Sequence, residues 1–516
     1  MTKLLHALVV ACLFTAAPAF AAADPVLGYD DARHLLARTG FGPTDAEVRA
    51  YAPLTRSEAV AKLLSGTRTT AVTPPPASAL DSTPLRVPRG SAVSDADRKA
   101  FRDQQIREGL ELRGWWTQEM LATPSPLTER MTLFWHNHFV SAQPKVRIAR
   151  LMYRQNVTLR AYALGNFGAF LHAIARDPAM VLYLNSVQNR KGAPNENFAR
   201  EVMELFTLGE GHYGEQDVKE AARAFTGYSL DRDTGAFVFR RGIHDDGVKT
   251  VLGQSGPFDG DAVLDVLLKQ PAAADFITAK LWREFVSPDP DPAEIARIGK
   301  RFRESNYEIK VALGAILTSD AFYAPRNRGV LVKSPVELVV GTLRQLGIEP
   351  AETLPFAIAA AGMGQNLLAP PNVKGWPGGD VWINTTTLLA RKTYLDRLTR
   401  ADDGATIATI TMAGSSEGDR MEMAHDTAPA VTPQDAADDE KGRQQRFRRR
   451  MERALASVHL DSARFLAQFS GTTPEARAQA AQRLLLATGP QQAPDRNADS
   501  LALVRELVLD AAYQLK

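Results

Sequence analysis

The stretch ERMTLFWHNHFVSA, residues 129–142, combines a helical pattern with charged and aromatic side chains. At about 100° per residue, Glu129 and His136 point in nearly the same direction, whereas His138 points away from His136. On one unbroken helix the two histidines cannot hold one metal ion. They could do so if the helix ended at His136 or if the segment were extended. Three roles stay open for this pair: metal ligands, acid–base groups, or hydrogen-bonded core residues.

Helical periodicity continues on both sides of this stretch, over residues 28–65, from about 99 to 225, and over 260–350. The convincing strand signal lies over 227–252, where AFVFRRG follows the turn-rich DRDTG. Residues 362–384 are too rich in Gly, Pro and Asn to form one regular element. The sequence therefore predicts a mainly α fold, a large multi-helix domain with a small inserted β-hairpin and long irregular loops.

Composition divides the chain into four parts. Residues 1–23 contain a lysine, an apolar stretch and small residues, as a secretory signal peptide does. Residues 24–400 are predicted to form the core helical domain, in which 68–98 is a linker rich in Pro, Ser and Thr. Residues 401–443 are polar and are interpreted as a disordered low-complexity insertion, followed by C-terminal helices over 444–516.

The predicted signal peptide implies a periplasmic or secreted protein, with cleavage near Ala21 to Ala23 and no transmembrane span afterwards. The alternative is a lipoprotein processed at Cys12, the single cysteine of the chain. If Cys12 leaves with the signal peptide, the mature chain has no cysteine, which excludes disulfides, thiol catalysis and cysteine-ligated metals. The net charge of +2 gives no general attraction to nucleic acid, so none is expected as a partner.

The segment NENFAREVMELFTLGEG, residues 195–211, carries a pair of acids. Glu201 and Glu204 lie about 60° apart beside an apolar stripe. Because an unpaired buried charge is costly, each acid needs a partner. Arg200, one turn before Glu204, would make a simple ion pair. Alternatively the two carboxylates are metal ligands, or one is a general base that meets His136. The candidate catalytic residues are therefore Glu129, His136, Glu201 and Glu204.

A third cluster lies in HDDGVKTVLG, residues 244–253. The Asp-Gly dipeptide is a turn former, but His244 and Asp245 could also ligate a metal or act as a tuned acid. Nitrogen and oxygen ligands without cysteine would suit iron, copper, manganese or zinc. The candidate metal ligands are His136, His138, Glu201, Glu204, His244 and Asp245.

The irregular segment 362–384 supplies candidate substrate-binding residues. They are Lys374, Trp376, Trp382 and Asn384. The tryptophans could give an aromatic floor for a sugar or a tyrosine, or pack in the core. The sequence has no HExxH helix and no Walker phosphate-binding loop, which argues against zincins and P-loop enzymes.

Eight ordered blocks between about residues 30 and 395 together resemble the bacterial family called domain of unknown function 1800. They are HLLARTGFGPTDAEV, ERMTLFWHNHFVSA, NENFAREVMELFTLGEGHY, EQDVKEAARAFTGY, HDDGVKTVLG, KSPVELVVG, LLAPPNVKGWPGG and WINTTTLLAR. Tyr228 departs from the pattern, which has a tryptophan after Thr-Gly. The resemblance implies export and frequent gene pairing with secreted, alkaline-phosphatase-like proteins of the family numbered 1501. It implies no established activity.

Three functions stay open on this evidence. The first is a metal-dependent enzyme that acts on an envelope polymer or an exported protein. The second is a non-catalytic envelope protein that binds or assembles a co-exported partner. The third is metal-free glycan cleavage by two carboxylates, which requires a separation of about 5 to 9.5 Å between them.

Overall fold

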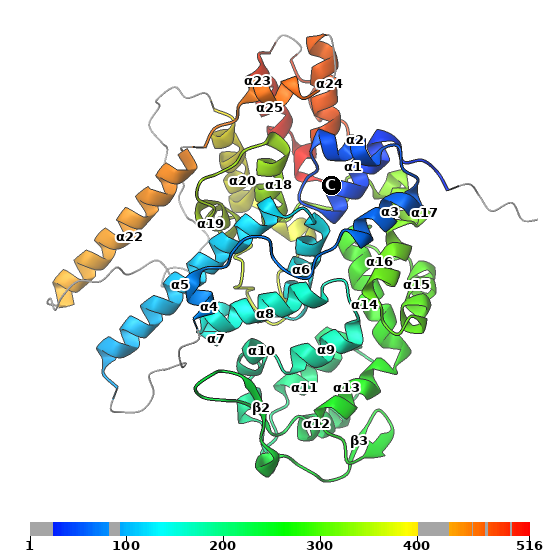
Figure 1. Ribbon diagram of the computed structural model, residues 1–516, viewed down its shortest axis with the longest axis vertical. Coiled ribbons are helices and arrows are strands. Elements are labelled where there is room, and N and C mark those ends of the chain that lie inside the picture. Colours follow the sequence, from blue (N-terminus) through cyan, green and yellow to red (C-terminus); the bar gives the residue numbers. More distant parts are fainter. Residues whose placement is uncertain (1–23, 82–92, 401–432, 457, 470–472, 496–497) are drawn as a thin grey trace, which may run out of the picture.

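The computed structural model describes residues 24–81, 93–400, 433–456, 458–469, 473–495 and 498–516. The predicted mainly α fold is confirmed, since helices dominate this part of the chain and its strands form two small antiparallel sheets (Figure 1). The predicted signal peptide and residues 401–432 of the predicted insertion lie outside the described residues.

The helices of the first half surround the stretch that carries the two histidines. They are α1 (Gly28–Thr39), α2 (Asp45–Tyr51), α3 (Arg56–Ser65), α4 (Ala77–Leu80), α5 (Asp95–Ala122), α6 (Pro126–His138), α7 (Gln143–Val146), α8 (Ala149–Tyr162), α9 (Phe167–Ala175), α10 (Pro178–Tyr183), α11 (Asn197–Glu201) and α12 (Glu215–Ala224). A π-helical turn (Val202–Thr207) continues α11, and short 3-10 turns cover Ser186–Gln188 and Arg241–Ile243. Two of these elements fall within or reach into the predicted linker, since α4 lies inside residues 68–98 and α5 begins before residue 98.

The second half is also helical. Its helices are α13 (Gly260–Leu268), α14 (Pro271–Phe285), α15 (Pro292–Glu304), α16 (Ile309–Leu317), α17 (Asp320–Tyr323), α18 (Pro335–Leu346), α19 (Leu354–Gly362), α20 (Thr385–Leu398), α22 (Pro433–Ala456), α23 (Ser462–Ala467), α24 (Pro474–Leu485) and α25 (Ser500–Leu509). Short 3-10 turns cover Pro325–Asn327, Gly379–Trp382 and Ala511–Gln514. Helix α22 begins inside the segment 401–443 that the sequence predicts as an insertion. No helix among the described residues has the length and apolar character that a membrane crossing needs.

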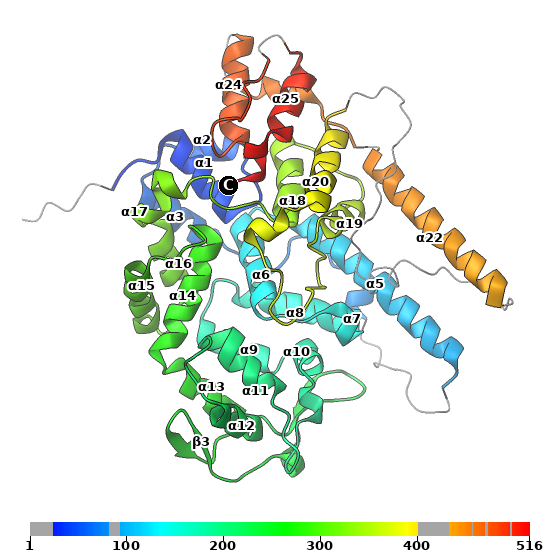
Figure 2. The ribbon, with the colours of Figure 1, turned by 180° about the vertical axis from the view of Figure 1, so that it is seen from behind.

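Helix α6 lies at the centre of the molecule and buries polar as well as apolar side chains. Pro126 stands at its start, where the missing N–H costs nothing. Its side chains from Leu127 to His136, and that of His138, are buried on all sides of the helix. It packs on α1, α5 and α8 (Figure 2). Because this helix is buried all round, each polar residue within it needs a partner.

The inserted β-structure differs in detail from the prediction of one hairpin over 227–252. Strands β1 (Tyr228–Leu230) and β2 (Phe237–Phe239) form one hairpin, in which Tyr228 pairs with Phe239. Strands β3 (Lys249–Val251) and β4 (Gln254–Gly256) form a second hairpin that extends past residue 252. Its turn is Leu252-Gly253, and both residues have positive φ. Leucine rarely adopts such a turn, so the sequence carries no signal for it.

Buried Asp177 gives the fold a pH dependence that can be tested. Its carboxylate caps α10 by accepting from the Met180 N–H (3.0 Å) and also accepts from Gln155 Nε2 (2.9 Å). Burial raises its pKa to about 7. Between its unfolded pKa, about 4, and its folded pKa, the folded state keeps a proton that the unfolded state has lost. The free energy of unfolding therefore falls as the pH rises through this window.

Replacing Asp177 by Asn is expected to remove this contribution while keeping the cap. The wild type should lose up to ~1.4 kcal/mol more per pH unit than Asp177→Asn between pH 5 and 7. Urea unfolding of both proteins at several pH values measures the difference, and other titrating groups cancel in the comparison. Equal pH dependence in the two proteins would show that Asp177 is ionised in the fold.

Candidate functional site

The polar residues at the end of α6 contact three different parts of the molecule. The helix runs without a break through Asn137 to His138, so the two histidines face different sides. The two histidines could have ligated one metal ion only if the helix had ended at His136 or if the segment had been extended. That arrangement is therefore not present.

His136 is buried between two tryptophans, Trp116 and Trp376, and Trp116 also binds Glu129. Its ring centroid lies 5.5 Å from that of Trp116 and 5.6 Å from that of Trp376. Burial lowers its pKa to about 3, so the imidazole is neutral at pH 7. Trp116 Nε1 donates to Glu129 (2.8 Å), which also forms a buried ion pair with Arg160 (2.5 Å). Glu129 is thus held by a structural ion pair and not presented as a base.

Asn137, which the sequence analysis missed, holds the irregular 362–384 segment. Its Oδ1 accepts from the Trp376 N–H (2.6 Å), and its Nδ2 donates to the Trp376 carbonyl (3.3 Å). Gly375 has a φ of +84°, and a Cβ there would lie 2.2 Å from Asn137 Oδ1. Only glycine permits this close approach. Asn137 and Trp376 are 239 residues apart, so no local pattern could reveal the contact.

His138 holds the end of the π-helical turn instead of a metal ion. Its Nε2 lies 3.2 Å from the Phe206 carbonyl, and its Nδ1 lies 3.1 Å from Lys280 Nζ. Lys280 also donates to the Leu205 carbonyl (3.2 Å). Burial lowers the pKa of Lys280 to about 8, so it is still mostly an ammonium at pH 7 and donates to Nδ1. Both ring nitrogens of His138 therefore already have hydrogen-bond partners.

The helix predicted over residues 195–211 changes its winding at Val202. Residues Asn197–Glu201 are α-helical, and Val202–Thr207 form a π-helical turn in which the Leu208 N–H bonds to the Met203 carbonyl (2.9 Å). π-helical turns are rare and often occur at functional sites. The carbonyls at its end are those that His138 and Lys280 satisfy. The winding places Glu201 at the junction and Glu204 within the turn.

Glu204 contacts side chains from two other segments. Tyr213 donates its hydroxyl to Glu204 Oε2 (3.0 Å), and Lys374 Nζ lies 4.0 Å from Oε1. Arg200, the ion-pair partner that the sequence suggested, binds Glu215 (2.7 Å) and Glu196 (3.1 Å). Burial, together with the bond to Glu204, raises the pKa of Tyr213 to about 12, so this hydroxyl keeps its proton.

Glu201 has a different environment. Burial raises its pKa, and the charge of Glu204 raises it further, against the opposing charges of Arg200 and Lys374. Burial raises the pKa of Tyr183, and the nearby charge of Glu201 raises it further. Glu201 thus keeps its proton to higher pH than an ordinary glutamate. Tyr183 and Tyr213 are further residues of the site that the sequence analysis missed.

The candidate substrate-binding residues of the 362–384 segment separate into different roles. Lys374 reaches the glutamates and is 68% exposed. Trp376 and Trp382 are only 4% and 6% exposed, so neither offers an open aromatic floor. Asn384 caps α20 by accepting from the Thr387 N–H (3.0 Å).

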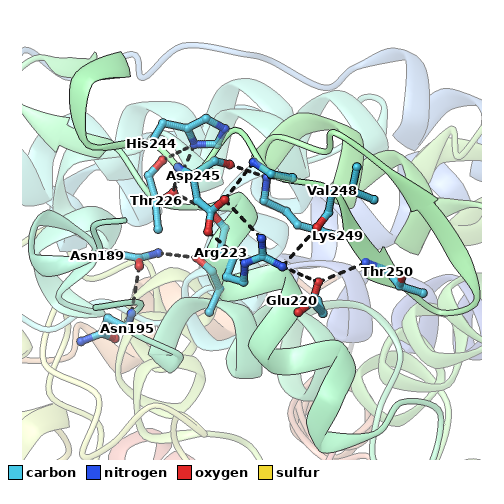
Figure 3. Close-up of polar contacts among 12 residues, drawn as sticks. Asn189, Asn195, Glu220, Arg223, Thr226, His244, Asp245, Val248, Lys249 and Thr250 are labelled. Atoms are coloured by element: carbon cyan, nitrogen blue, oxygen red, sulfur yellow. Dashed lines mark hydrogen bonds and ion pairs between the residues drawn. The ribbon is translucent and has the colours of Figure 1, made fainter. Parts of the chain in front are cut away.

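His244 and Asp245 belong to a separate network, which Figure 3 shows. His244 Nδ1 donates to the Thr226 carbonyl (2.8 Å), and Arg223 Nε donates to Asp245 (2.9 Å). The bond to Arg223 is the main cause that lowers the pKa of Asp245 to about 2. Lys249 Nζ donates to the Gly247 carbonyl (2.9 Å). These contacts fasten the loop between the hairpins to α12.

The six candidate metal ligands therefore do not form one site. His136 and His138 face different sides of α6, Glu201 ends α11 beside Glu204 of the π-helical turn, and His244 with Asp245 lies by α12. Within the described ranges, no three His, Cys, Asp or Glu side chains are grouped so that they could hold a metal ion. What the chain does bring together is Glu201, Glu204, Tyr183, Tyr213 and Lys374.

Replacing Asn137 by Ala is expected to release the segment that carries Lys374. Two hydrogen bonds to Trp376 are lost, at a cost of ~1–3 kcal/mol. Trypsin should then cut after Lys374 about tenfold faster, because cleavage needs local opening of the loop. Asn384→Ala is the matched control, since it loses a helix cap of ~1 kcal/mol without freeing this bond. Equal cleavage rates in both variants would contradict the anchoring role.

A comparison with known protein families matches nearly the whole chain. A family model described as Protein of unknown function (DUF1800) matches residues 34–515. No curated protein and no solved structure matches the chain. The matched residues include the end of α6, both glutamates and Lys374. The description assigns no activity, so the function has to be argued from the site.

Proposed function

We propose that this chain, which belongs to the family described as Protein of unknown function (DUF1800), is a hydrolase whose glutamate pair moves protons. Glu201 is the general acid and Glu204 is the general base. One observation supports this division of roles. The pKa of Glu201 is raised by burial and by its neighbour, whereas Glu204 accepts a hydrogen bond from Tyr213 and faces Lys374. Two carboxyl groups in unlike environments are a frequent basis of acid–base catalysis.

The substrate class that fits this pair is a glycan of the cell envelope. Glu201 would protonate the oxygen of the leaving sugar while Glu204 activates water. Glu204 is 19% exposed and Lys374 is 68% exposed, so a polymer can approach from solvent. The metal-free reaction is preferred over the metal-dependent one because both ring nitrogens of His138 have hydrogen-bond partners and, among the described residues, no three His, Cys, Asp or Glu side chains are grouped to hold a metal ion.

The place of action in this proposal is outside the cytoplasm. Residues 1–23 have the composition of a secretory signal peptide. The mature chain would then meet its polymer in the periplasm or after secretion. A co-exported protein of the family numbered 1501 is the proposed partner there.

Polysaccharide turnover tests the proposal. Purified protein is incubated with peptidoglycan and with other envelope polysaccharides, and new reducing ends are measured with and without EDTA. The expected result is release of reducing ends that EDTA does not change. Loss of activity in EDTA, restored by one added metal, would favour the metal-dependent enzyme and contradict this mechanism.

A second candidate function is non-catalytic binding of the co-exported partner at the same place. The observation that favours it is the exposed Lys374 beside two acids, which offers both charges to a protein surface. Co-purification with the partner that Lys374→Glu abolishes, together with no turnover of any polymer, would support this function over hydrolysis.

A further inference from the structure

A small cavity lies between α1, α18, α24 and residues 515–516 (Figure 1), and neither glutamate of the proposed pair lines it. Its volume is about 20 Å³. A water molecule needs ~10–15 Å³ on this scale, so the cavity takes one or two waters or a group of that size. The charged side chains that line it are Arg33, Lys333, Glu337 and Lys516. Three cations thus face one acid, and these side chains carry a net charge of +2.

Lys333 differs from the other two cations of the cavity in what its charged group contacts. Lys516 pairs with Glu337, and Arg33 Nη2 donates to a backbone carbonyl (3.4 Å). Lys333 Nζ instead lies over the ring of Tyr513, 3.7 Å from its centroid. Within the described part of the chain, no hydrogen bond or ion pair joins this nitrogen to another residue. An aromatic face attracts the cation without accepting a conventional hydrogen bond, so the nitrogen remains open to a further partner.

The surroundings of Lys333 favour a neutral amine. Burial is the main cause that lowers its pKa to about 7, and the charge of Arg33 lowers it further against the charge of Glu337. Near pH 7 roughly half of this side chain is therefore an uncharged nucleophile. An ordinary lysine, with a pKa of about 10.4, is neutral in fewer than ~1 in 1,000 molecules at that pH. The cations that disfavour an ammonium here would stabilise an anion in its place.

We propose that Lys333 is a carbamylation site that takes up CO₂ reversibly within this cavity. The lone pair of Nζ attacks the carbon of CO₂, and an N–C bond forms. One C=O bonding pair moves onto oxygen and one N–H proton passes to water, which leaves a carbamate, –NH–COO⁻. Two cations, Arg33 and Lys516, then face two anions, Glu337 and the carbamate, so the net charge of the lining falls from +2 to zero. This inference does not depend on the proposed function.

Chemical trapping on the wild-type protein tests the proposal without any substitution. The purified full chain is equilibrated with ¹³C-bicarbonate near pH 7, its carboxyl groups are ethylated with triethyloxonium, and its peptides are sequenced by mass spectrometry. We expect an ethylated ¹³C-carbamate on Lys333, at least about tenfold more abundant than on Lys62, because so much more of the Lys333 amine is neutral. Lys62 is the matched control, since its Nζ also lies over a tyrosine ring, that of Tyr51 (4.4 Å), but outside this cavity.

Carbon-13 NMR of two variants gives a second readout. Lys333→Arg keeps the positive charge, but its guanidinium stays protonated and cannot attack CO₂. We expect a carbamate signal that the wild type and Lys62→Arg share and that Lys333→Arg lacks. The proposal is overturned if trapping finds no carbamate on Lys333, if Lys333 and Lys62 are labelled equally, or if Lys333→Arg keeps every carbamate signal. Bound bicarbonate without a new N–C bond would also overturn it, and would show simple anion binding in the cavity.

Discussion

Replacing Glu201 by Gln is expected to lower polysaccharide turnover by a factor of ~10²–10⁴. Glutamine has the same shape but cannot donate a proton to the leaving oxygen. The loss should appear in kcat and leave KM nearly unchanged, since the variant still fills the same space. Rates of reducing-end release by the wild type and the variant measure the effect. Glu210→Gln, an exposed acid three residues past the π-helical turn, is the control and should retain full turnover.

The pH profile distinguishes this catalytic role from a structural one. Activity requires protonated Glu201, so it should fall as the pH rises through the raised pKa of this group. Glu204→Gln removes the charge of Glu204, which raises the pKa of Glu201. Residual activity of that variant should therefore decline at lower pH than in the wild type. Full activity of Glu201→Gln, or a decline at the same pH in Glu204→Gln, would contradict the assignment.

The largest expected loss of stability comes from replacing Glu337 by Gln. Glu337 is buried at the start of α18, where it accepts from the Ser334 N–H (2.8 Å) and pairs with Arg130 (2.8 Å) and Lys516. Burial alone would raise its pKa, but the charges of Arg130 and Lys516 outweigh burial and hold the pKa below its usual range. The variant leaves these cations without their shared acid. Breaking a buried pair in this way costs ~3–5 kcal/mol.

Glu47→Gln is the matched control for Glu337→Gln. Both acids occupy the same position of a capping box, but Glu47 is partly exposed where it pairs with Arg344 (2.9 Å). Its replacement should cost at most ~1 kcal/mol. Urea unfolding at pH 7 compares the two. The penalty for Glu337→Gln should shrink as the pH falls below about 4.5, the ordinary glutamate value, toward the lowered folded pKa. Equal small losses in both variants would show that the buried cluster carries no net stabilisation.

The helical period of the α6 sequence predicted the directions of its side chains as well as its helical state. It placed His138 on the other side from His136, and the unbroken helix has this geometry. What the period could not supply was the identity of the partners. His138 meets Phe206 and Lys280, which are 68 and 142 residues away, and Asn137 meets Trp376 across 239 residues. Long-range hydrogen bonds depend on how helices pack, and a single sequence does not encode that locally.

The acids of the site illustrate the same limit. Their spacing predicted that Glu201 and Glu204 lie near each other, and both line the π-helical junction. The choice of partner was wrong for Arg200, because Glu215 at the start of α12 competes for it. A change from α- to π-winding has no residue signature in this segment. The carbonyls at its end have partners on α6 and α14, which are distant in the sequence.

The most direct test of the central claim is the titration of Glu201 itself. Carbon-13 labelling of the glutamate carboxyl groups allows their pKa values to be followed by NMR, and Glu201→Gln identifies the resonance by its absence. We predict a group that titrates above the ordinary value of 4.5 in the wild type and shifts downward in Glu204→Gln. An ordinary pKa for Glu201, or one that does not respond to Glu204→Gln, would contradict a coupled acid–base pair.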